Sequence, residues 1–213
     1  MSNPVQYRIF HSDAAPLTCL SGAALLIMAS DRLAHAIIAT GALVWVYCLS
    51  SLTAHSSAKA FPRWGRTVLF VFLTSFFAGT YLLLLWILSP LCALESFFII
   101  SLIPVFCMVS GVFKQLGTML TEDAFVASFS EALIFGALIV IFALIREPFG
   151  FLSLSLPGGA QGIILLFSFK TESFLPIRLI ASSAGALLLL GYFLGLYRYF
   201  RVKYGLREGQ DGF

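Results

Sequence analysis

The chain has 213 residues, of which 60% are hydrophobic and only 11% are charged. Ordinary soluble domains carry about 25% charged residues, so this composition excludes a soluble domain and indicates a polytopic membrane protein. Most lysines and arginines stand at the ends of apolar segments, as membrane topology requires, and form no basic–aromatic pattern for nucleic acid. At least three of the four cysteines lie in or beside apolar segments, which argues against a disulfide framework.

Six apolar segments follow one another along the chain. A helix needs about 20 apolar residues to cross a bilayer, and four segments reach that length. They cover residues 33–53, 67–88, 124–145 and 177–200. Two shorter runs, 14–29 and 96–113, are interrupted by Pro16 and Pro104. Because proline is favoured in the first turn of a helix and disruptive in its interior, each proline is expected to start a short helix.

The connection over residues 146–176 is longer than the others. It contains Pro157-Gly158-Gly159 and an apolar run at 162–169 that is too short to cross a membrane. We expect a loop that lies on the membrane surface.

The sequence also repeats weakly. Pro-x-x-Cys occurs at Pro16–Cys19 and again at Pro104–Cys107. Gly41-Ala42-Leu43 has a counterpart in Gly136-Ala137-Leu138, and the stretches 78–83 and 184–189 share the pattern Ala-Gly-x-x-Leu-Leu in the same order. A repeat of three segments must enter the membrane from opposite faces in its two copies, and such inverted repeats place their functional site near the midplane.

These observations predict one all-α integral membrane domain over residues 1–213. It would have six transmembrane segments arranged as two inverted three-helix repeats, at about 12–90 and 96–200, with broken first and fourth helices. Counting Lys and Arg in alternate compartments gives nine on the side of both termini and four on the other, which predicts cytoplasmic termini. The nine are Arg8, Lys59, Arg63, Arg66, Lys114, Arg198, Arg201, Lys203 and Arg207, and the four are Arg32, Arg146, Lys170 and Arg178.

Cys19 and Cys107 are the strongest candidates for chemistry. Two thiols at equivalent points of a repeat can form a disulfide, supply half of a metal site, or pack as small buried hydrophobes, and spacing alone leaves packing an equal alternative. A helix N-terminus favours a thiolate, so two short helices aimed at one point suit an anionic cluster. Cys48 and Cys92 have neither a repeat counterpart nor a preceding proline.

Charged residues inside apolar segments are the other candidates, because burying a charge is costly. Glu131 lies within the fifth segment, as an ion ligand or a solvated residue near the helix end. Arg146-Glu147-Pro148 follows that segment and reads either as a helix stop or as an ion pair that docks on a neighbour. The three histidines show no ligand spacing, and no phosphate-binding or nucleotide motif occurs.

Three stretches resemble a family of paired six-helix membrane subunits, found in the Rnf-type ferredoxin:NAD oxidoreductase and the sodium-pumping NADH:quinone oxidoreductase. Residues 129–150 are similar to the family's Asp-Gly-Phe…Leu-Arg-Glu-x-x-Gly segment, and 102–111 to its Pro-Leu-Ile-x-x-Asn-Cys-x-x-x-Gly segment. Residues 49–53 resemble its Leu-Thr-Asn-Leu-Thr, while the stretch around Cys19 fits its Gly-x-Cys by position. The likeness, to the Rnf E / Nqr D branch, covers about residues 12–200.

The resemblance implies that Cys19 and Cys107 ligate a membrane-embedded [2Fe–2S] cluster, with the other two cysteines coming from an inverted sister subunit of the Rnf A / Nqr E type. It further implies electron passage across the bacterial plasma (inner) membrane between the ferredoxin or NADH side and flavin subunits, coupled to Na⁺ or H⁺ transport. The chain would then be a non-autonomous subunit of a redox-driven ion translocase. The family's Asp-Gly is Ala127-Ser128 here, and Glu131 is the candidate to replace that aspartate.

Two other functions remain open from the sequence. The first is a small inverted-repeat secondary transporter without a redox cofactor, in which the cysteines pack and the broken helices bind substrate. The second is a purely structural membrane subunit.

Overall fold

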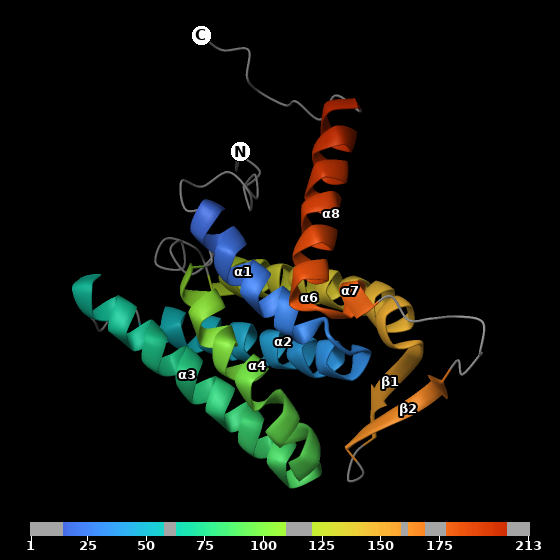
Figure 1. Ribbon diagram of the computed structural model, residues 1–213. Helices are drawn as coiled ribbons and strands as arrows, with labels where there is room; N and C mark the ends of the chain where they lie inside the picture. The colour runs from blue at the N-terminus through green and yellow to red at the C-terminus, as the bar shows by residue number, and fades with distance from the viewer. Residues whose placement is uncertain (1–14, 58–62, 110–120, 159–161, 169–177, 204–213) are drawn as a thin grey trace.

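The computed structural model describes residues 15–57, 63–109, 121–158, 162–168 and 178–203 (Figure 1). Its helices are α1 (Ala15–Ala29), α2 (Leu33–Ser57), α3 (Arg63–Leu88), α4 (Pro90–Val109), α6 (Thr121–Phe151), α7 (Arg178–Ala181) and α8 (Ser183–Lys203), and its strands are β1 (Ser153–Pro157) and β2 (Ile163–Ser168). Among the described residues, α2, α3, α4 and α6 are long and apolar enough to cross a membrane. The chain is therefore a mostly helical, membrane-embedded protein.

Several predicted segments appear where expected. The spans predicted at 33–53, 67–88 and 124–145 lie within α2, α3 and α6, and Pro16 stands in the first turn of the short helix α1. The segment predicted at 177–200 is divided into α7 and α8, with an apolar part of α8 that covers only Ser183–Leu196. The break has a local cause, because the Ser182 hydroxyl accepts a hydrogen bond from the Gly185 N–H (3.2 Å) and so caps the start of α8.

The prediction of a short helix starting at Pro104 is wrong. Helix α4 runs without interruption from Pro90, with Pro104 inside it and Cys107 in its last turn. The start is fixed by Ser89, whose hydroxyl accepts from the Cys92 N–H (3.3 Å), and by Pro90 in the favoured first helical position. Transmembrane helices tolerate an internal proline because neighbouring groups satisfy the freed backbone. Cys92 accordingly lies in a helix rather than in a connection.

The expected surface loop over 146–176 is also wrong in its described part. Helix α6 continues past Arg146 and Pro148 to Phe151, and an antiparallel hairpin of β1 and β2 follows. Leu152 turns the chain between them with a φ of 51°, in the left-handed region. The fold is thus not purely α-helical. The apolar residues of β2 from Ile164 to Phe167 are exposed. Residues 169–177 lie outside the described part.

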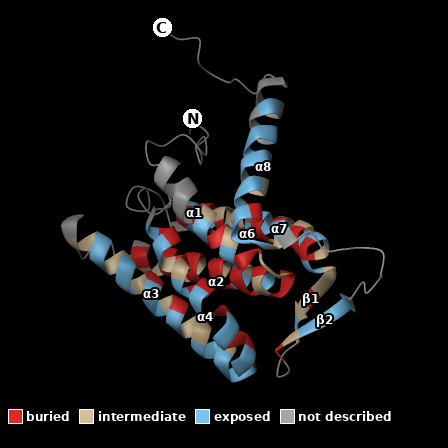
Figure 2. Cartoon of the chain, in the orientation of Figure 1, coloured by how far each residue is buried: buried red, intermediate tan, exposed pale blue. Residues whose placement is uncertain are grey.

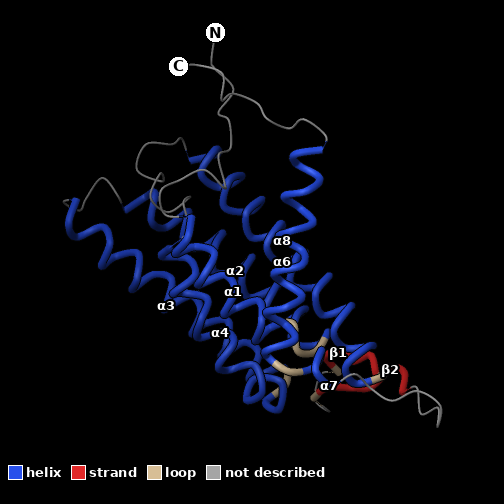
Figure 3. Tube along the Cα trace, turned by 45° about the horizontal axis from the view of Figure 1, so that its top comes forward, coloured by secondary structure: helices blue, strands red, loops and turns tan. Residues whose placement is uncertain are grey.

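The core is built on an antiparallel pair, α2 and α6. Leu33 at the start of α2 meets Glu147 near the end of α6, and Thr40 meets Gly136 further along both helices, where the Thr40 hydroxyl lies 3.2 Å from the Gly136 carbonyl. A Cβ on Gly136 would overlap the Thr40 side chain, so the close approach depends on glycine. Figure 2 shows α2 largely buried and α3 more exposed, and Figures 2 and 3 both place α2 in the middle of the molecule and α3 at its side.

We predict that Gly136→Ala destabilises the protein in detergent by about 1–3 kcal/mol, the usual range for overpacking. Gly79→Ala is the matched control, because a Cβ there meets nothing within 4 Å. Thermal unfolding of both variants measures the difference. Equal melting temperatures would contradict a close α2–α6 contact at this glycine.

Candidate functional site

Two groups of side chains in the core include the residues selected from the sequence. The first group surrounds Cys107, whose side chain is completely buried. The Tyr47 side chain on α2 and the Glu131 carboxylate on α6 are both near enough to interact with the Cys107 thiol electrostatically. Glu131 itself is half-buried, ten residues after the start of α6 at Thr121.

An aromatic layer covers this thiol. The rings of Phe106 and Phe135 stack at 4.3 Å between centroids, and Tyr47 lies against Phe106 at 6.1 Å. A Cβ built on Gly22 of α1 would be 3.3 Å from both phenylalanine rings. The backbone of α1 therefore packs directly on the residue that precedes Cys107. Cys19 lies one turn before Gly22 in α1, but its side chain is outside the described part of the structure.

The other cysteines stand apart from this layer. Cys92 is buried in the first turn of α4 and Cys48 is half-buried in α2, and both are free thiols, like Cys107. Among the described residues, no three His, Cys, Asp or Glu side chains come together as a metal-binding group.

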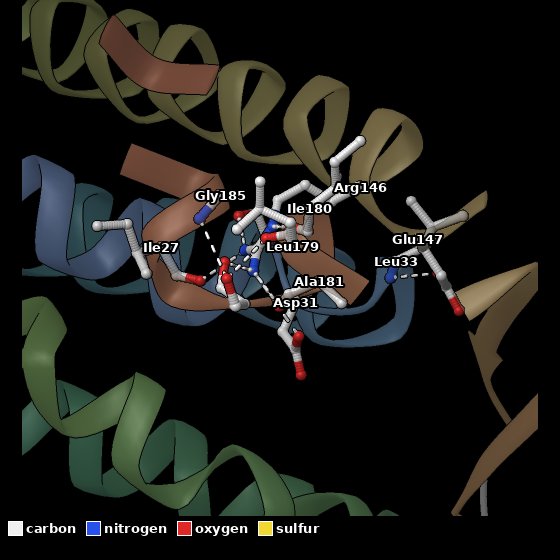
Figure 4. A network of polar contacts seen from close by, with 11 residues as sticks. Ile27, Asp31, Leu33, Arg146, Glu147, Leu179, Ile180, Ala181 and Gly185 are labelled. Carbon is white, nitrogen blue, oxygen red and sulfur yellow. Dashed lines mark hydrogen bonds and ion pairs between the residues drawn. The ribbon is translucent and has the colours of Figure 1, made fainter. Parts of the chain in front are cut away.

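The second group lies near the end of α6, where the structure places the predicted residue Arg146 (Figure 4). Arg146 is 2% exposed, and its guanidinium joins two helix ends. Nη1 donates to the Ile27 carbonyl (2.9 Å) and to the Ser30 hydroxyl (2.8 Å) at the end of α1. The other nitrogens donate to the carbonyls of Ile180 (3.3 Å), Ala181 (2.9 Å) and Ser182 (3.4 Å) at the α7–α8 junction.

This network satisfies the full donor set of an arginine. A guanidinium has five N–H groups, and here five oxygens accept from them. The partial negative charge at a helix C-terminus also favours a cation at α1. Asp31, 3.9 Å away and 41% exposed, is the ion-pair partner that the structure gives it. Arg146 thus docks α6 on two other helices.

Glu147 joins a further helix, α2, to this region by accepting a hydrogen bond. Its Oε2 accepts a hydrogen bond from the Leu33 N–H (2.7 Å), the first residue of α2. The next N–H, of Ala34, points to the Ser155 hydroxyl of β1 at 3.5 Å. The first N–H groups of a helix have no intrahelical acceptor, and Arg32 before α2 has no acceptor side chain, so α6 and the hairpin supply them.

Sequence reasoning selected Cys107, Glu131, Arg146 and Glu147 but missed the groups that surround them. Tyr47, His35 and Ser155 all face these sites from elements that are distant in sequence. The one available signal was the helix start at Leu33, which lacks a capping side chain immediately before it.

Comparison with models of known protein families and with curated proteins finds no match for this chain. The two sites therefore rest on their own geometry.

We predict that Arg146→Met destabilises the protein by about 3–5 kcal/mol, the range seen when one partner of a buried charged network is removed. Arg146→Lys should recover part of the loss, because an ammonium still offers three donors. Thermal unfolding in detergent measures both. Arg32→Met is the matched control at the same helix junction, where the Arg32 guanidinium lies over the Phe151 ring, 5.9 Å from its centroid. A loss of stability no larger than that of Arg32→Met would contradict the role of Arg146 in joining these helices.

Proposed function

We propose that this chain is a membrane subunit of an ion-translocating electron-transport complex of the Rnf/Nqr type, and that Cys19 and Cys107 supply half the ligands of a [2Fe–2S] cluster. The observation that carries the proposal is the contact of Gly22 with Phe106. Gly22 follows Cys19 by one turn and Phe106 adjoins Cys107, so the two cysteine-bearing turns belong to neighbouring stretches of helix.

The packing of α2 on α6 supports the inverted repeat that the proposal includes. Helices related by a twofold axis in the membrane plane run antiparallel, and α2 and α6 do so around Thr40 and Gly136. Gly136 begins the Gly-Ala-Leu triplet of the second repeat, and Thr40 directly precedes the triplet of the first. In this arrangement α1 and the α7–α8 segment complete six crossings.

The donor set fits half of such a cluster. A [2Fe–2S] cluster takes four thiolates, and the remaining two would come from a homologous inverted sister subunit. When bound, the cluster would relay one electron at a time through the bilayer. Cys107 would hold it from the end of α4, while Phe106, Phe135 and Tyr47 exclude water from the sulfur.

Removing either thiol should abolish the cluster. We predict that the complex containing this chain, purified without oxygen and reduced, gives an iron–sulfur signal in electron paramagnetic resonance that is lost in Cys19→Ala and in Cys107→Ala. Cys48→Ala and Cys92→Ala are the matched controls and should retain it. The signal should decrease with the bound iron content measured on the same samples.

A signal that survives both cysteine changes would overturn the proposal. Ion transport without any cluster would instead favour a secondary transporter, in which these cysteines only pack. The intact complex is required, because the isolated chain lacks half the ligands.

The orientation can be tested separately in a bacterial host. With both termini in the cytoplasm of the plasma membrane, green fluorescent protein fused after Phe213 should fluoresce and alkaline phosphatase at the same position should be inactive. Alkaline phosphatase inserted after Gly158, between β1 and β2, should be active. The reverse pattern would contradict the expected topology.

A further inference from the structure

One oxygen of the Glu147 carboxylate accepts no hydrogen bond from the described residues. Glu147 is 0% exposed, and while its Oε2 accepts from Leu33, its Oε1 is buried without a hydrogen bond from any described residue. Arg146, its neighbour in sequence, directs its donors to carbonyls and to a hydroxyl instead. A buried carboxylate oxygen without a donor is costly in an apolar interior, and a bound cation or proton removes that cost.

His35 likewise has a buried polar atom without a hydrogen bond from the described residues. His35 lies in the first turn of α2, two residues after Leu33, and its side chain is 14% exposed. Its Nε2 is likewise buried without a hydrogen bond among the described residues. Glu147 is close enough to His35 to interact with it electrostatically. Two titratable groups, each with a buried polar atom that forms no hydrogen bond with the described residues, therefore lie near one another.

This pair has a connection to the surface. Glu95, near the start of α4, has Oε2 3.9 Å from His35 Nε2, and its side chain is 50% exposed. The exposed fraction of the side chain thus falls from Glu95 through His35 to Glu147. Chains of Glu and His inside membrane proteins are typical of proton relays.

Asp31 and Arg32, on the turn between α1 and α2, act on His35 with opposite signs. Arg146 of α6 pairs with Asp31 at 3.9 Å. The hairpin contributes the Ser155 hydroxyl, which accepts from the Ala34 N–H. A metal ion such as Na⁺ needs several oxygen ligands, whereas a proton needs one basic atom, and the unpartnered atoms here are one oxygen and one nitrogen.

We propose that Glu147 is a proton-binding site that exchanges protons with the membrane surface through His35 and Glu95. In the transfer, a proton leaves Nε2 of the His35 imidazolium and binds Oε1 of Glu147, which leaves a neutral imidazole and a neutral carboxylic acid. A proton from the Glu95 side then restores the imidazolium. The role of this proton as the coupling ion rests on the proposed function, but its binding to Glu147 does not.

Infrared difference spectra of the complex in lipid, recorded on acidification, test the site. We expect the carbonyl band of a protonated carboxylic acid that is absent in Glu147→Gln and unchanged in Asp123→Asn. Asp123 is the matched control because it is an exposed carboxylate in the first turn of the same helix. Glutamine keeps an acceptor for the Leu33 N–H, so the variant should fold, and its melting temperature verifies this.

The passage is tested by the rate at which the same band shifts on transfer to D₂O. His35→Gln should slow that exchange about 100-fold, the lower range for a positioned acid–base group. Glu95→Gln should slow it less, because water can reach His35 from the exposed side. An unchanged rate in His35→Gln would overturn the passage.

Two results would overturn the proton site itself. One is a band that persists in Glu147→Gln, and the other is a band that added Na⁺ removes at constant pH, which would indicate a metal-ion site. The iron–sulfur signal of Glu147→Gln separates this inference from the proposed function. It should persist when the carboxylic acid band is lost, whereas failure of the cysteine test leaves the band in place.

Discussion

Three helix ends, those at the end of α1, the start of α2 and the end of α7, are held together by the Arg146 guanidinium and the Glu147 carboxylate. Helix ends leave carbonyl and N–H groups without partners, and an apolar membrane interior has no water to supply them. Arg146 supplies donors to the end of α1 and to the α7–α8 junction, and Glu147 supplies an acceptor to the start of α2. Two adjacent residues of α6 thereby satisfy groups from three other helices, α1, α2 and α7, and the positions of these helices depend on them.

The contact of Thr40 with Gly136 extends this constraint along α2 and α6. Glu147 fixes one end of the α2–α6 pair, and the Thr40–Gly136 contact fixes its middle. The remaining part of the pair then determines where Tyr47 and Glu131 lie relative to Cys107. Glu131 and Glu147 are separated by about 24 Å along α6, from the helical rise per residue. One rigid antiparallel pair therefore connects the thiol site with the buried carboxylate.

Hydropathy was enough to predict α2, α3 and α6, because apolar length is a direct requirement of the bilayer. It failed at α4, where Ser89 and Pro90 form a helix start that outweighs the local preference of Pro104. The β1–β2 hairpin is set by strand pairing and by the turn at Leu152, which no apolar pattern records. Arg146 was recognisable as a candidate, but its acceptors are mostly backbone carbonyls, and these carry no signature in the sequence.

Pro104 has a mechanical consequence for the thiol. It has no N–H, so the Ile100 carbonyl lacks the intrahelical donor that another residue at 104 would supply. Fewer backbone hydrogen bonds then connect the final turn of α4 to the rest of the helix, at a point about one turn before Cys107. A slight bend there would displace the sulfur while the other end of α4 stays anchored at Ser89. The point at which α4 bends most easily is therefore close to the Cys107 thiol.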